Sequence, residues 1–245
     1  TGWGSGKLPE TFRLSRWTKI HILGLMQRKR HQKPSGASSS HWGVLVNPKA
    51  TGHTRTIGES LIREIKKRGG HYTVEEPESA QALAQAALVM AGQVPGATSV
   101  NVGRFGKITG LIAVGGDGTF NLVARAAHQA DLPVGVIPTG RFNNLAHWLY
   151  GEVKPSAAIS KLLEGSYRKV DVGLVGDRQF FSSIGLGLVP ELATVLESRR
   201  TPLFGIGWSR LGAQAAANVK MHKTLLKVDA VRFDFEPIFL NVNLL

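Results

Sequence analysis

The residues best suited to chemistry lie in the glycine-rich turn GGDGT at residues 115–119. An apolar run precedes this turn at residues 111–114, and a helical pattern begins at Phe120. Glycines let the backbone bend sharply and approach a ligand without a Cβ in the way. The amides at the start of the following helix point in the same direction, so the pattern predicts a phosphate-binding turn. The motif alone leaves an ordinary turn between a strand and a helix as the alternative.

The elements that must position this turn alternate between strands and helices. Strands are predicted at residues 43–46, 71–76, 111–114 and 134–137, and helices at 56–68, 78–90, 120–130, 145–150 and 156–164. This alternation is typical of an α/β fold with a parallel sheet. Two further polar turns, at 47–52 and 138–144, also follow predicted strands. Ligands bind at the carboxyl edge of such sheets, so the three turns are expected to lie together there.

The charge of the chain favours an anionic partner. Its 245 residues include 30 lysines and arginines against 17 aspartates and glutamates, a net charge of +13. This excess favours nucleotide, nucleic acid or acidic lipid as the partner. The absence of cysteine excludes disulfides, thiolate metal sites and a cysteine nucleophile. No run of residues approaches the roughly 18 apolar residues that a membrane span needs.

The first 40 residues are expected to form a basic arm and linker. They hold eight basic residues and one acidic residue, Glu10, and so carry +7 of the net charge. The arm contains Trp17 and the run RKRH at 28–31, and residues 33–40 are typical of a flexible linker. We expect the arm to lie on an anionic membrane surface or to dock on a protein partner, a solvated tail being the alternative. Nucleic-acid binding by the arm is a weaker alternative.

Together, the three turns resemble the nucleotide-site motifs of the diacylglycerol kinase catalytic-domain family, which includes diacylglycerol, sphingosine and ceramide kinases and bacterial lipid kinases. NPKATG at 47–52, GGDGT at 115–119 and PTGRFNNLA at 138–146 follow the order of the family's signatures, and the resemblance continues through 168–173 and 180–185. It implies a two-domain kinase with ATP in the cleft and Mg²⁺ bridging its phosphates. The fold class that we expect is α/β, with a parallel-sheet nucleotide-binding domain followed by a mostly β second domain.

The resemblance also implies domain boundaries. We expect the arm and linker over 1–40, the nucleotide-binding domain over 41–165 and a β-rich lipid or substrate domain over 166–245. Residues 225–235 and 238–245 alternate in the manner of strands, and the chain stops within this pattern. An incomplete β domain would leave an open sheet edge, so we expect the chain to be a piece of a longer protein.

The residues of the three turns fit this chemistry. The cofactor-binding candidates are Asn47, Gly115, Gly116, Gly118, Thr119, Gly140, Arg141 and Asn143. Asp117 is the acidic residue of these turns, and a carboxylate beside polyphosphate is repelled unless a cation or proton lies between them. Asp117 is therefore expected to hold Mg²⁺ directly or through water, or to take the proton from the attacking lipid hydroxyl group. Glu191 resembles an acid that family members place near the lipid headgroup; an ordinary acidic residue in the first turn of a helix is the alternative.

Two positions depart from the family pattern. Leu122 stands where the family usually has Glu after GGDGTxN, and Arg141 stands where it usually has Thr. The loss of the Glu removes an acidic contact near the nucleotide. Arg141 either pairs bidentately with phosphate or fills the site. Both changes put efficient catalysis in doubt.

The sequence thus predicts an ATP-dependent kinase that transfers the γ-phosphate to the hydroxyl group of a diacylglycerol-like or sphingoid-like lipid. One alternative is a catalytically weak or inactive family member that binds nucleotide or lipid within a larger assembly. Another is a kinase of a soluble substrate, because GGDGT also occurs in NAD kinases. For the lipid kinase we expect a cytoplasmic location with peripheral attachment to membranes.

Overall fold

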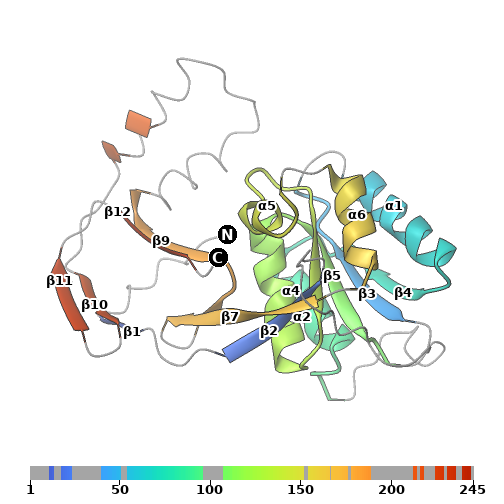
Figure 1. Cartoon of the computed structure of the whole chain (residues 1–245), viewed down its shortest axis with the longest axis horizontal. Coiled ribbons are helices and arrows are strands. Elements are labelled where there is room, and N and C mark those ends of the chain that lie inside the picture. The colour runs from blue at the N-terminus through green and yellow to red at the C-terminus, as the bar shows by residue number, and fades with distance from the viewer. Residues whose placement is uncertain are drawn as a thin grey trace. The chain divides into compact units, whose positions relative to one another are not determined.

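The chain forms two compact units, shown in Figure 1. The computed structural model describes residues 11–13, 18–23, 40–50, 54–95, 107–151, 154–165, 167–175, 178–188, 212–213, 216–217, 224–228, 231–235 and 239–243. We call residues 18–172 the α/β unit, and residues 1–17 with 173–245 the β unit.

A single sheet forms the centre of the α/β unit. Its strands are β2 (Thr18–Leu23), β3 (His41–Val46), β4 (His71–Glu75), β5 (Gly110–Gly115), β6 (Val134–Pro138) and the part of β7 (Tyr167–Val175) up to Val172. The order across the sheet is β4-β3-β5-β6-β2-β7. Neighbours from β4 to β2 are parallel, and β7 is antiparallel to β2. The predicted α/β fold with a mostly parallel sheet is therefore confirmed.

Helices cover both faces of this sheet. They are α1 (Thr54–Lys67), α2 (Ala80–Met90), α4 (Asp117–Gln129), α5 (Asn144–Tyr150) and α6 (Pro155–Leu163). Helix α1 packs beside α6, and α2 packs beside α4. The crossover through α1 runs across the sheet in the opposite direction to those through α2 and α4. Because such crossovers are right-handed, α1 and α2 lie on opposite faces.

Helix α4 begins earlier than its apolar pattern predicts. The expected start is Phe120, but the helix starts at Asp117 with Gly116 as its N-cap residue. The Phe120 N–H donates to the Gly116 carbonyl oxygen at 3.0 Å, which closes the first helical turn around polar residues. Gly118 and Thr119 therefore belong to the helix and not to a turn before it.

Strand β2 corrects the expectation that residues 1–40 as a whole form an arm and linker. It pairs in parallel with β6 and antiparallel with β7. Ile20 and Ile22 are 2% and 0% exposed, so their burial favours a place in the sheet over a solvated tail. The alternation of these isoleucines with polar neighbours is the strand signal that the sequence analysis missed. Trp17 and the basic run at 28–31 lie outside the described residues.

The β unit contains short strands. They are β1 (Thr11–Arg13), β8 (Arg178–Phe180), β9 (Ser183–Gly187), β10 (Thr224–Val228), β11 (Val231–Phe235) and β12 (Phe239–Asn243). Strands β1, β10 and β11 form one sheet, β9 pairs with β12, and β8 pairs with the end of β7. The predicted strand at 225–235 is thus a hairpin of two strands. Among the described residues, no helix is both long and apolar enough to span a membrane.

His21 of β2 makes the stability of the α/β unit depend on pH. Burial and the charge of Lys169 lower the pKa of His21 below 6.5, while Asp131, whose Oδ1 lies 3.9 Å from Nδ1, opposes this shift. As the pH falls below 6.5, the unfolded chain takes up this proton before the folded chain does. Stability that is present at neutral pH is therefore lost as the pH falls toward the lowered pKa.

We expect the His21→Gln variant to lose less stability on acidification than the wild type does. The measurement is urea unfolding at about pH 7.5 and about pH 5.5, the range in which histidine titrates. The difference in free energy of unfolding between the two pH values is compared for the two proteins. An equal loss in both would contradict the assignment.

Candidate functional site

Three polar loops meet at the carboxyl edge of the α/β sheet. They follow β3, β5 and β6, which are adjacent and parallel, so their ends lie side by side. Residues 47–50 form the described part of the first loop, GGDGT forms the second, and residues 139–143 form the third. The expectation from sequence that the three turns share one edge is confirmed.

The GGDGT segment joins a strand directly to a helix. Gly115 ends β5, Gly116 is the extended N-cap residue, and residues 117–119 form the first turn of α4. A Cβ on Gly115 would lie 2.5 Å from the Cβ of Thr119, so only glycine fits there. Gly116 has no side chain with which to cap α4. The amides of its first turn have no acceptor within the helix, and they form a partial positive charge at the sheet edge.

Asn47 ties the first loop to this helix. Its Nδ2 donates to the Thr119 hydroxyl oxygen at 2.9 Å, and its Oδ1 accepts from the Lys49 amide at 3.0 Å. The backbone N–H of Asn47 donates to the Val114 carbonyl oxygen at 3.0 Å. The hydrogen bond between Asn47 and Thr119 therefore holds the two loops against each other.

The third loop packs against the second without room for a side chain. The Gly140 amide donates to Asn143 Oδ1 at 2.9 Å, and Asn143 Nδ2 donates back to the Gly140 carbonyl oxygen at 2.8 Å. Asn143 has a φ of 52°, a left-handed conformation that asparagine tolerates better than most residues. A Cβ on Gly140 would overlap the Cα of Gly116. Gly140 is thus required by the close approach of two backbones, and a side chain at Gly116 would make a tight contact.

Asp117 caps a helix that begins far along the chain. Its Oδ2 accepts from the Asn144 amide and its Oδ1 accepts from the Leu145 amide, both at 3.0 Å. These amides lie in the first turn of α5, whose own N-cap residue Asn143 makes no side-chain cap. The sequence does not reveal this role, because a cap from a residue so distant leaves no local pattern. The contact fixes α5 to the GGDGT segment.

The remaining candidate residues differ in their exposure and in their distance from the three loops. Arg141 is exposed at the tip of the third loop, and Leu122 is half-buried in α4. The hydroxyl oxygen of Thr139, which the sequence analysis did not single out, is buried without a hydrogen-bond partner. Its amide donates to the Gly115 carbonyl oxygen at 3.0 Å. Glu191 lies outside the described residues.

The described residues do not form a metal site made of protein ligands alone. No group of three His, Cys, Asp or Glu side chains among them is arranged to hold a metal ion. Asp117 is the acid of the three loops, and each of its oxygens keeps a lone pair beyond the amide that it accepts. A Mg²⁺ ion at this edge would therefore depend on phosphate oxygens and water for most of its ligands, as Mg²⁺ at phosphates commonly does.

Comparison with known proteins gives matches over the same part of the chain. The model of the diacylglycerol kinase catalytic domain matches residues 41–175. A Staphylococcus epidermidis protein, provisionally named a lipid kinase, is 33% identical over 127 residues, which is 51% of this chain and 38% of that protein. A diacylglycerol kinase of Staphylococcus carnosus is 32% identical over 97 residues, which is 39% of this chain and 32% of that protein. The chain thus matches well under half the length of these relatives.

Solved structures show the same fold. A diacylglycerol kinase from Bacillus anthracis has a TM-score of 0.57 at 16% identity, covering 85% of this chain and 65% of that one. A second Bacillus anthracis structure, provisionally titled a diacylglycerol kinase, has a TM-score of 0.60 at 18% identity, again covering 85% of this chain and 65% of that one. Likeness at these identities concerns the fold alone.

Proposed function

Because the chain belongs to the diacylglycerol kinase catalytic domain family, we propose that it transfers the γ-phosphate of ATP to the hydroxyl group of a lipid. The observation that carries this proposal is the joining of the three motif loops at one sheet edge. Asn47 bonds to Thr119, Asp117 bonds to the start of α5, and Gly116 packs on Gly140. A site assembled from three loops fits positioning and charge stabilisation, which are the main demands of phosphate transfer.

The residues of the site fit the polyphosphate of ATP. The first-turn amides of α4, which have no acceptor within the helix, would donate to phosphate oxygens, and the glycines at 116 and 140 keep side chains out of that space. Arg141 would add a fixed positive charge at the loop tip. A bound Mg²⁺ ion would neutralise charge on the phosphates, and Asp117 would hold it directly or through water.

The proposed lipid acceptor is taken from the substrates that the family resemblance implies. We assign a diacylglycerol-like or sphingoid-like hydroxyl group as the acceptor, with Glu191 near the headgroup. The alternative role of Asp117 is that of the base that takes the proton from this hydroxyl group. The basic segments of residues 1–40 would hold the protein at an anionic membrane surface or on a protein partner, in keeping with a cytoplasmic, peripherally attached enzyme.

One observation favours a second candidate, a family member that binds nucleotide with little catalysis. Both oxygens of Asp117 already accept backbone amides, and this contact reduces its capacity to act as a base or a metal ligand. Leu122 supplies no carboxylate where the family pattern has one. Such a protein would still bind Mg-ATP at the same loops.

A transfer assay separates these functions. The chain is incubated with γ-³²P-labelled ATP, Mg²⁺ and vesicles of mixed lipid extract, and the lipids are then extracted and resolved. Labelled lipid is the expected result. Binding of Mg-ATP in calorimetry without labelled lipid would favour the non-catalytic candidate. A parallel reaction with NAD as acceptor tests the soluble-substrate alternative, which labelled NADP in place of lipid would favour.

A further inference from the structure

Two large apolar side chains are exposed on the segment that contains α5. Phe142 is 48% exposed and Trp148 is 36% exposed, and they are the exposed large hydrophobic residues within the described part of the chain. The other large side chains of α5 are buried: Leu145 at 0%, Leu149 at 5% and Tyr150 at 5%. One face of α5 therefore packs on the unit, and the other presents an aromatic ring to solvent.

The helix geometry leans Trp148 toward the end of α5 that follows the loop with Phe142. Phe142 lies in the loop before α5, and Trp148 lies one turn beyond the first residue of the helix, Asn144. Side chains on a helix lean toward its N-terminus, so Trp148 covers the surface over the first turn and leans toward the loop. The loop is held by the Gly140–Asn143 hydrogen bonds, and the helix is held by Asp117. The backbone that carries both rings is therefore held by hydrogen bonds, and binding through the rings would need little further ordering of that backbone.

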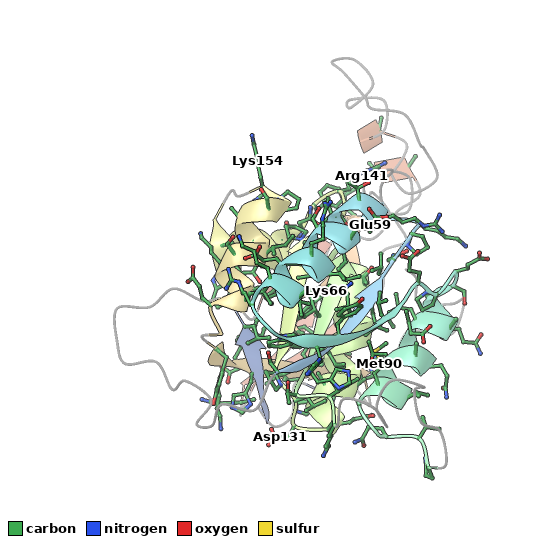
Figure 2. The ribbon with its side chains drawn as sticks, turned by 90° about the vertical axis from the view of Figure 1, so that its right-hand side faces the viewer. Glu59, Lys66, Met90, Asp131, Arg141 and Lys154 are labelled. Carbon is green, nitrogen blue, oxygen red and sulfur yellow. The ribbon has the colours of Figure 1, made fainter. Side chains whose placement is uncertain are left out.

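Basic side chains accompany the rings. Arg141 and Lys154 are exposed, and they are the lysines and arginines of the described residues 138–151 and 154–155. The acid in contact with this segment is Asp117, whose carboxylate accepts the Asn144 and Leu145 amides. Glu152 lies outside the described residues. Figure 2 shows Arg141 and Lys154 at one end of the α/β unit, with Asp131 at the opposite end. Lys154 points away from the ribbon in this view.

We propose that this α5 surface, consisting of Phe142, Trp148 and Lys154, binds an anionic lipid bilayer. Tryptophan and phenylalanine with neighbouring basic residues are the side chains that suit the boundary between headgroups and acyl chains. A protein partner generally needs a broad patch with an apolar core, whereas this surface exposes two apolar side chains. The small pocket beside α5 has a volume of about 140 Å³, similar to a cavity that holds one benzene ring, so it has room for about one side chain of a partner. A bilayer needs no such groove.

The proposal goes beyond the transfer reaction and is tested without nucleotide. The whole chain is floated with vesicles of phosphatidylcholine alone or mixed with phosphatidylglycerol. Wild type is expected to float more with the anionic vesicles. The double variant Phe142→Ser with Trp148→Ser is expected to lower the partition coefficient about tenfold or more, because it removes the apolar area that inserts.

Two variants that each remove one positive charge test whether Lys154 contributes to vesicle binding. Lys154→Gln is expected to lower binding to anionic vesicles about fivefold, the effect of one lysine near such a surface. Lys107→Gln is the matched control, since Lys107 is exposed ahead of β5 at the amino edge of the sheet and the variant has the same net charge. Equal effects of these two variants on vesicle binding would contradict the role given to Lys154 in this surface.

The double variant Phe142→Ser with Trp148→Ser tests whether the two aromatic side chains bind the bilayer. Vesicle binding by the double variant within about twofold of wild type would overturn the proposal. If the double variant also lost self-association while its vesicle binding stayed unchanged, the surface would be assigned to a second copy of the chain. Thermal unfolding of the double variant shows whether it is folded at the flotation temperature, because Trp148 is 36% exposed and its buried part contributes to stability. Failure of lipid phosphorylation with intact vesicle binding would count against the proposed function and not against this surface.

Discussion

Replacement of Asp117 by asparagine is expected to lower phosphate transfer about a hundredfold or more, the loss typical of removing one positioned polar group from such a site. The variant loses the negative charge that would hold Mg²⁺ or accept a proton. It also places an NH₂ group against one of the two amides that the carboxylate accepts at 3.0 Å, those of Asn144 and Leu145. The loss of that hydrogen bond is expected to cost about 1–3 kcal/mol of folding stability.

Three measurements separate these effects. The transfer rate reports the reaction, calorimetry reports Mg-ATP binding, and hydrogen exchange of the Asn144 and Leu145 amides reports the cap. Ser79→Ala is the matched control, because it removes the N-cap hydrogen bond from Ser79 Oγ to the Ala82 amide at the start of α2. This control is expected to lose about 1 kcal/mol of stability with normal transfer. Transfer by Asp117→Asn within about threefold of wild type would show that Asp117 acts only as a helix cap.

Replacement of Gly140 by alanine is expected to separate the second and third loops and to weaken ATP binding about tenfold or more. The added Cβ would overlap the Cα of Gly116 and would approach Asn143 Oδ1 to 2.9 Å. The loops must then move apart, which disturbs the two hydrogen bonds between Gly140 and Asn143. Overpacking of this kind costs about 1–3 kcal/mol of stability.

Other glycines of the chain provide a graded control. A Cβ on Gly116 would lie 3.1 Å from the Cα of Gly140, so Gly116→Ala is expected to have a smaller effect than Gly140→Ala. A Cβ on Gly212 would have no neighbour within 4 Å, so Gly212→Ala is expected to be neutral. Stability comes from denaturant unfolding, and affinity comes from calorimetry with Mg-ATP. Equal ATP affinity in the Gly140 and Gly212 variants would falsify the role given to the loop contact.

The order of elements in the α/β unit could be predicted because its signals are local. Strands β3, β5 and β6 are apolar runs that end in polar turns, and helices α1 and α4 carry an apolar period of their own. Parallel strands then place the ends of β3, β5 and β6 at one edge. The approximate position of the site follows from these patterns alone.

Strand β2 could not be assigned in the same way. Its apolar residues are few, and basic residues surround it in the sequence. Its partners β6 and β7 lie more than one hundred residues away, as the pairing of Ile22 with Val134 illustrates. Only the assembled sheet offers Ile20 and Ile22 a buried position, and that burial decides the structure of the segment.

The sequence by itself determined the α/β class, the three motif loops and the edge that they share, because runs, turns and helical periods act over a few residues. Only the tertiary structure decided how the loops hold one another. The cap by Asp117 on α5 and the contact of Gly116 with Gly140 both join residues more than twenty positions apart. It also decided that Phe142 and Trp148 stay exposed while Leu145 and Leu149 are buried. These features depend on which surfaces meet when the chain packs, and no local pattern encodes that.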